Sequence, residues 1–167
     1  MLKKFNKNVD FKILATGIIA YRKARVDKLF TYKDVESTLK KLKEKGIKLC
    51  VVSDAPKLNA YGRLVSIGIV DYFDFVITFD DTRKLKPHSL PFTKALEKLN
   101  TRNDEVLMMG DNIERDILGA NKLGLKTCLA KYGTAGREIK FNAKVKPDYE
   151  INEFRELLKI VEQNVFK

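Results

Sequence analysis

Short apolar runs alternate with amphipathic helical segments along most of this chain, and that alternation restricts the possible folds more than any other feature. The runs IKLCVV, FDFVITF, EVLMMG and KTCLA occupy residues 47–52, 73–79, 105–110 and 126–130. Segments with apolar residues at helical spacing lie between these runs and after the last one. Strands that alternate with helices predict an α/β fold in which a parallel, doubly wound sheet lies between two layers of helices.

Glycine and cap residues set approximate limits for the predicted helices. A helix over residues 32–46 is expected to end at Gly46, because glycine readily adopts the left-handed conformation that closes a helix. A helix over residues 89–100 is expected to take Ser89 as its N-cap. The other helices are expected over residues 57–68, over residues 113–124 and from residue 152 onward. Residues 47–52 are predicted to form a strand that is covered on both faces.

Length and composition predict a soluble globular protein of about one domain. Of the 167 residues, 44% are hydrophobic and 33% are charged. No stretch is apolar for long enough to span a bilayer, and the initial MLKKFNKNVDF lacks the apolar block of a signal peptide. We therefore expect a cytoplasmic protein with no membrane partner. Cys50 and Cys128 each lie within an apolar run, so both are predicted to be small buried hydrophobic residues.

The charge balance favours anionic partners. Thirty-three Lys and Arg residues against 22 Asp and Glu residues give a net charge of +11. Phosphorylated metabolites, nucleic acid and acidic surfaces all fit that charge, and a solvated helical surface explains most of the lysines. The sequence contains no recognised nucleic-acid-binding module and no basic stretch interleaved with aromatic residues, so nucleic acid is not an expected partner.

Ser53 and Asp54 follow the first apolar run directly. Ligands of parallel sheets collect beyond the carboxyl ends of the strands. At such a position a hydroxyl group and the unpaired amides of a turn can hold a phosphoryl oxygen. The alternative is that Ser53 or Asp54 only caps the helix that follows.

A second polar group follows the run 105–110. Gly110 allows a tight turn there, and Asp111 offers the hard oxygen ligand that magnesium prefers. Asp116, on the next helix, is placed to return toward the same site and hold a metal-bound water or a lysine. Both acids are alternatively first-turn residues favoured by the helix dipole. Lys86, which precedes a proline, is a candidate to neutralise phosphate charge, the alternative being a surface lysine.

These segments, in this order, resemble motifs two, three and four of the haloacid dehalogenase superfamily, in its archaeal phosphatase-like branch. The resemblance assigns phosphate binding to Ser53, Asp54 and Lys86, and metal ligation to Asp111. It assigns catalytic roles to Lys86, which stabilises charge, and to Asp116, which supports the metal or the lysine. The family's phosphatases form an aspartyl phosphate and hydrolyse it with the help of Mg²⁺.

The resemblance extends over essentially the whole chain and implies two parts. Residues 13–30 resemble the last helix of the family's helical cap, so residues 1–30 are expected to be a cap remnant. Residues 31–167 are expected to form the Rossmann-like core, incomplete at its N-terminus. The family's first motif, a strand ending in Asp-x-Asp-Gly-Thr, does not occur in the printed sequence. Asp80 and Thr82 imitate it after a strand, but the resemblance places them away from the site.

The family's first strand lies between the strand that ends at Ser53 and the strand that ends before Asp111. Without it, those two strands are expected to have unpaired edges. A separately encoded N-terminal fragment, direct pairing of the two strands, or a second copy of the chain would each satisfy these edges.

The function expected from the resemblance is that of a magnesium-dependent phosphatase. Its substrate would be a small phosphorylated metabolite such as a triose phosphate or phosphoglycolate, and it would need the nucleophile segment for activity. The alternatives are a noncatalytic phosphate- or partner-binding module and an enzyme truncated at its start codon.

Overall fold

The computed structural model describes residues 12–13, 16–17, 20, 29–134 and 145–163. The chain divides into two units, Met1–Phe30 and Thr31–Lys167. In the first unit the described residues 12, 13, 16, 17 and 20 are helical, and the Thr16 hydroxyl donates to the Lys12 carbonyl at 2.8 Å, one turn earlier. Residues 29 and 30, the last of the predicted cap helix, are described and are not helical; its other positions lie outside the described residues. No helix in the described part of the chain is both long and apolar enough to cross a membrane.

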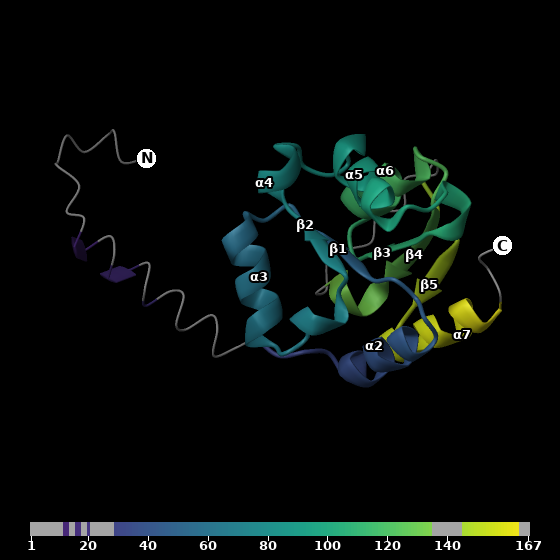
Figure 1. Ribbon diagram of the computed structural model, residues 1–167, viewed down its shortest axis with the longest axis horizontal. Helices are drawn as coiled ribbons and strands as arrows, with labels where there is room; N and C mark the ends of the chain where they lie inside the picture. The colour runs from purple at the N-terminus through teal and green to yellow at the C-terminus, as the bar shows by residue number, and fades with distance from the viewer. Residues whose placement is uncertain (1–11, 14–15, 18–19, 21–28, 135–144, 164–167) are drawn as a thin grey trace. The chain divides into compact units, whose positions relative to one another are not determined.

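Strands and helices alternate through the second unit, which confirms the predicted α/β class (Figure 1). The strands are β1 (Cys50–Val52), β2 (Phe75–Ile77), β3 (Leu107–Gly110), β4 (Lys126–Ala130) and β5 (Tyr149–Ile151). The helices are α2 (Val35–Glu44), α3 (Lys57–Ser66), α4 (Phe79–Thr82), α5 (Ser89–Leu99), α6 (Leu118–Asn121) and α7 (Leu157–Glu162). Short turns of other helix types connect them: η2 (Val70–Tyr72), η3 (Asn103–Glu105), η4 (Ile113–Ile117), η5 (Lys131–Thr134) and η6 (Phe154–Glu156).

The strands form two parallel groups, in agreement with a parallel sheet that lacks one strand between β1 and β3. One group has the order β1-β2 and the other the order β3-β4-β5. The registers place Val51 opposite Val76, and Met109 opposite Cys128. Among the described residues β1 and β3 are not paired with each other, and the division falls where the family resemblance places another strand. Both strands are half-buried along their length.

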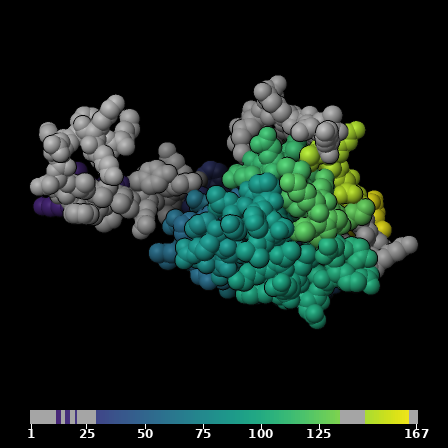
Figure 2. All heavy atoms as spheres, turned by 90° about the horizontal axis from the view of Figure 1, so that it is seen from above, coloured from purple at the N-terminus to yellow at the C-terminus, as the bar shows by residue number. Residues whose placement is uncertain are grey.

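Helices cover both faces of these strands. In Figure 1, α2 and α7 lie on one side, and α5 and α6 lie on the other. The side chains of β3 alternate accordingly: Leu107 and Met109 pack with the α2 and α7 side, whereas Met108 packs with Phe92 of α5. Figure 2 shows the face with α5 and α6, where the teal and green segments form a continuous surface.

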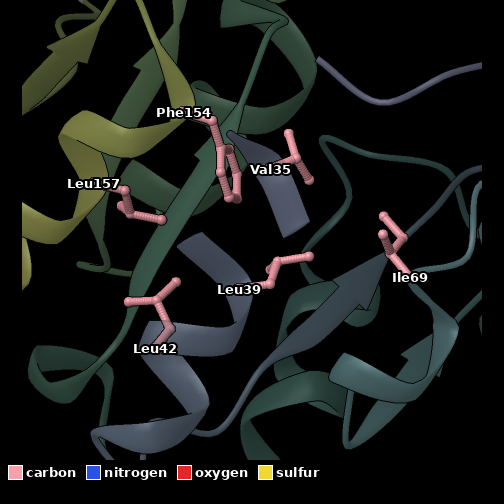
Figure 3. Close-up of a cluster of buried hydrophobic side chains, with 6 residues drawn as sticks. All are labelled: Val35, Leu39, Leu42, Ile69, Phe154 and Leu157. Atoms are coloured by element: carbon pink, nitrogen blue, oxygen red, sulfur yellow. The ribbon is translucent and has the colours of Figure 1, made fainter. Parts of the chain in front are cut away.

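The largest apolar cluster joins α2 to α7 (Figure 3). Its buried members come from α2, from the turn after α3, and from the η6–α7 segment; they are Val35, Leu39, Leu42, Ile69, Phe154 and Leu157. Leu39 and Leu42 follow the helical spacing seen in the sequence, and Gly46 closes the helix region with a φ of 75°. Half-buried Leu49, next to β1, and Leu107, in β3, pack against the same cluster. One layer of side chains therefore supports both strand groups.

Several local predictions need correction. Ser89 is the first residue of α5 and not its cap, because the His88 side chain accepts the Leu90 N–H at 3.1 Å and His88 is the N-cap. The predicted helix over residues 113–124 is a π-helical turn, η4, followed by the short α6. The helix expected from residue 152 begins as η6 and continues as α7. The sequence analysis missed β5, which has only three residues.

Candidate active site

Ser53 and Asp54 leave the carboxyl end of β1, and neither caps the next helix. The N-cap of α3 is Pro56, and the helix begins at Lys57. The Ser53 Oγ accepts the Ala55 N–H at 3.1 Å. A hydroxyl that accepts a hydrogen bond in this way keeps its own hydrogen available to donate. The alternative that these residues only cap α3 is therefore wrong.

Lys86 lies in the turn before α5, and its ammonium group is buried between two oxygen acceptors. Nζ donates to the Val52 carbonyl at 2.8 Å and lies 2.7 Å from Asp116 Oδ1. The Lys86 and Asp116 side chains are only 11% and 7% exposed. Val52 ends β1, whereas Asp116 follows β3, so this one charge connects the carboxyl ends of the two strand groups. Lys86 is therefore not a surface lysine.

Asp116 lies within η4, and both of its carboxylate oxygens have partners. Oδ1 faces Lys86, and Oδ2 accepts the Asn112 N–H at 3.1 Å. A Cβ atom at Gly110 would overlap the Asp116 side chain. Gly110 is not among the glycines with positive φ, so it is this close approach that requires a glycine. Asp116 does lie in the first turn of η4, as the alternative interpretation expects, but it is also buried and ion-paired with Lys86.

Asp111 follows β3 directly, and η5 packs against its side chain. A Cβ atom on Gly133 would lie 2.7 Å from the Asp111 Cβ. The neighbouring Tyr132 ring meets the Tyr32 ring edge-on, with centroids 4.8 Å apart. Burial raises the pKa of the Tyr132 hydroxyl, with smaller contributions from Cys128, Tyr32 and Asp111. The Tyr132 hydroxyl, near Asp111, therefore stays uncharged.

The donor set at these strand ends can be compared with what Mg²⁺ requires. No three His, Cys, Asp or Glu side chains gather closely enough to hold a metal by themselves within the described ranges. Asp116 is engaged with Lys86, and Asp111 is the carboxylate that follows β3 directly. Mg²⁺ is commonly held by one or two carboxylates, with water and phosphate oxygens as its other ligands. Asp111 fits such a partly hydrated ion and does not fit an all-protein cage.

Asp54 connects two other parts of the site. Its Oδ1 accepts the backbone N–H of Lys86 at 2.9 Å. Its Oδ2 lies 3.5 Å from Nη1 of Arg115, the residue before Asp116. The Asp54 side chain is 19% exposed and the Arg115 side chain is 49% exposed. Asp54 therefore fixes the backbone of the Lys86 turn and places one guanidinium group at the solvent side of the site.

The structure brings Asp54, Lys86 and Asp116 into direct contact, and it places Ser53 and Asp111 at the carboxyl ends of β1 and β3. Sequence reasoning did not identify Arg115, because one arginine among 33 basic residues carries no distinguishing signal.

Asp80 and Thr82 lie elsewhere, on α4 after β2. The Asp80 Oδ2 accepts the Lys57 N–H at 2.6 Å, and the Thr82 hydroxyl donates to the Lys84 carbonyl at 3.1 Å. Asp80 and Thr82, which resemble the first family motif in sequence, therefore make structural hydrogen bonds with neighbouring backbone groups.

Comparison with known proteins supports the resemblance. The haloacid dehalogenase-like hydrolase family matches residues 1–130. The chain is 30% identical over 163 residues to a glyceraldehyde 3-phosphate phosphatase of Pyrococcus furiosus, which covers 98% of this chain and 68% of the relative. It is 33% identical over 159 residues to the pyrophosphatase PpaX of Halalkalibacterium halodurans, which covers 93% of this chain and 73% of that relative.

Solved structures give the same result. The HAD phosphatase from Thermococcus onnurineus superimposes with a TM-score of 0.68 at 34% identity, covering 78% of this chain and 58% of that chain. The chain thus spans between about three fifths and three quarters of the length of these relatives. The HAD-hydrolase YfnB from Bacillus subtilis, solved bound to magnesium, shares the fold at 23% identity, with a TM-score of 0.74 and coverage of 96% and 67%. The chain belongs to the haloacid dehalogenase-like hydrolase family.

Proposed function

We propose that this chain is the core part of a magnesium-dependent phosphomonoester hydrolase that acts on small phosphorylated metabolites. The relatives named above include phosphatases of glyceraldehyde 3-phosphate, which supports a substrate of that size. We also propose that the protein works in the cytoplasm, where the free thiols of Cys50 and Cys128 would stay reduced.

The observation that carries this proposal is the buried ammonium group of Lys86. A lysine that is 11% exposed is costly to keep charged unless oxygen atoms surround it, and here Val52 O and Asp116 Oδ1 do so. Its position at the carboxyl ends of β1 and β3 is where parallel sheets bind ligands. There the ammonium group would hold a phosphoryl oxygen while Asp116 keeps it oriented, and the Ser53 hydroxyl would donate to a second oxygen.

The metal would be held at Asp111 and would offset the negative charge of the phosphoryl group. Gly133 lies close to the Asp111 side chain, so a larger residue at position 133 would crowd that carboxylate. In this arrangement Asp111 binds the ion, whereas Asp116 acts on Lys86.

The nucleophilic carboxylate would come from a strand that inserts between β1 and β3. The geometry of β1 supports this proposal, because the Leu49 carbonyl and the Ser53 N–H both bond to the β2 side. Backbone groups of a parallel strand alternate between its two edges. The backbone of Cys50 and Val52 therefore faces the other edge, where Lys86 takes the Val52 carbonyl. An N-terminal segment that carries the family's first motif would supply both the strand and its nucleophile, whereas a second copy of the chain, which lacks that motif, would supply a strand alone.

Hydrolysis of p-nitrophenyl phosphate with Mg²⁺ tests the proposal. We expect little activity from the chain alone, and activity when a peptide with an apolar run ending in Asp-x-Asp-Gly-Thr is added. The matched control peptide replaces the first Asp with Asn and should remain inactive. Activity of the chain alone that Asp111→Asn abolishes would place the nucleophile within these 167 residues and contradict the inserted strand.

A phosphate-binding module without catalysis is the second candidate. It is favoured by the donor set, since no cluster of three potential metal ligands occurs in the part of the chain that the structure describes. If the protein binds inorganic phosphate but does not hydrolyse p-nitrophenyl phosphate even with the Asp-containing peptide present, that result would support this candidate.

A further inference from the structure

We infer that Arg115 selects substrates that carry a carboxylate in addition to the phosphoryl group. This inference rests on the proposed function, because it assumes that the phosphoryl group binds at Ser53 and Lys86. Arg115 Nη1 lies 3.5 Å from Asp54, the residue that also accepts the Lys86 backbone N–H, so the guanidinium group lies near the Lys86 turn. Arg115 would contact a second charged group of the substrate, away from the phosphoryl group.

The guanidinium group is already next to a carboxylate, but the contact is a weak one. Nη1 of Arg115 lies 3.5 Å from Asp54 Oδ2, and the Arg115 side chain is half exposed. Exposed ion pairs of this kind contribute little to stability. By contrast, the other Asp54 oxygen accepts the Lys86 N–H at 2.9 Å. Arg115 can therefore exchange its partner while Asp54 keeps the Lys86 turn in place.

A carboxylate is the group best suited to this exchange. The planar guanidinium group presents parallel N–H donors that fit both oxygens of a carboxylate, and the single Nη1 contact to Asp54 does not use that capacity. A substrate carboxylate entering from solvent would take over the guanidinium group with two short hydrogen bonds. A neutral substituent at the same place would leave Arg115 with Asp54 and gain nothing.

Binding of two probes to the purified chain with Mg²⁺, measured by isothermal titration calorimetry, tests this inference. Phosphoglycolate carries a carboxylate, and ethyl phosphate of similar size does not. We expect phosphoglycolate to bind about tenfold more tightly to the wild type, since one charge-assisted hydrogen bond accounts for that ratio. Arg115→Gln should abolish the preference of the protein for phosphoglycolate over ethyl phosphate.

The matched control is Arg102→Gln. Arg102 is exposed, pairs with Asp104 and lies before the amino end of β3, at the opposite end of the strand from the site. It should retain the wild-type preference. If Arg115→Gln weakened both probes equally, Arg115 would only support Asp54, and the inference would be overturned. Equal binding of the two probes by the wild type would overturn it as well, with the phosphate site intact. Failure of the wild type to bind either probe would contradict the proposed function and this inference together.

Discussion

Replacing Lys86 with methionine should destabilise the protein far more than the same replacement at Lys43. Lys86 Nζ lies 2.7 Å from Asp116, and Lys43 Nζ lies 2.8 Å from Asp74, so the two ion pairs have almost the same length. They differ in burial: the Lys86 and Asp116 side chains are 11% and 7% exposed, whereas Lys43 and Asp74 are 36% and 34% exposed. The two pairs therefore differ in burial and in the additional hydrogen bond of Lys86 to the Val52 carbonyl.

The expected magnitudes follow from what each substitution leaves behind. Lys86→Met leaves the buried Asp116 carboxylate with only the Asn112 N–H as its partner and removes the donor to the Val52 carbonyl. Breaking a buried pair in this way costs about 3–5 kcal/mol of unfolding free energy. Lys43→Met exposes Asp74 to water and should cost less than about 1 kcal/mol.

Urea unfolding followed by circular dichroism measures both changes. With a denaturant slope of about 2 kcal/mol per molar urea, Lys86→Met should lower the midpoint by roughly 2 M and Lys43→Met by less than roughly 0.5 M. The double variant Lys86→Met/Asp116→Asn should recover part of the loss, because it removes the unpaired charge as well. If the two single variants lost similar free energy, the claim that burial makes the Lys86 pair critical would be refuted.

Three further predictions concern stability. Gly119→Ala would place a Cβ atom 2.5 Å from the buried Phe92 ring, so thermal unfolding should show a loss of about 1–3 kcal/mol. Gly62→Ala, in an exposed part of α3 with nothing within 4 Å, should instead stabilise the protein by about 0.5–1 kcal/mol in the same assay. Although burial raises the pKa of Asp81, hydrogen bonds from Lys57 and Thr78 lower it to about 2. Because this folded-state pKa lies below the ordinary 3.8, Asp81 stabilises the folded protein above pH 4, and this stabilisation is lost as the pH falls through 2. It should amount to about 1–2 kcal/mol. In Asp81→Asn, the unfolding free energy plotted against pH should therefore fall less steeply at acid pH.

The sequence predicts the elements whose signals are long and periodic. The helical spacing of α2 and the stops at Gly46, Gly68 and Gly124 agree with the structure, where all three glycines have positive φ. It does not predict β5, since three residues give too little alternation to separate a strand from a loop. Nor does it predict the π-helical start of the segment after β3, where the Asn112 side chain accepts the Arg115 N–H and directs the first turn.

Some features of the candidate site can likewise be predicted from the sequence, and others cannot. Ser53 and Asp111 directly follow predicted strands, and Lys86 lies just before a predicted helix, so their order along the chain already places them in the loops where parallel sheets bind ligands. The partners of each side chain depend on distances between loops that lie far apart in the sequence. The 2.9 Å contact of Asp54 with the Lys86 backbone and the position of Arg115 are of that kind.

The alignment of the two strand groups depends on side chains on the helical faces as well as on the site itself. β1 and β3 share no strand pairing among the described residues, yet Leu49 beside β1 and Leu107 in β3 both pack on the α2–α7 cluster of Figure 3. That apolar layer sets the separation of the strands from one face, and the Lys86 contacts with Val52 and Asp116 set it at the carboxyl ends. Neither constraint uses backbone pairing between β1 and β3, and on the free edge of β1 Lys86 contacts the Val52 carbonyl. An inserted strand would thus complete hydrogen bonding in a site whose charges are already in place.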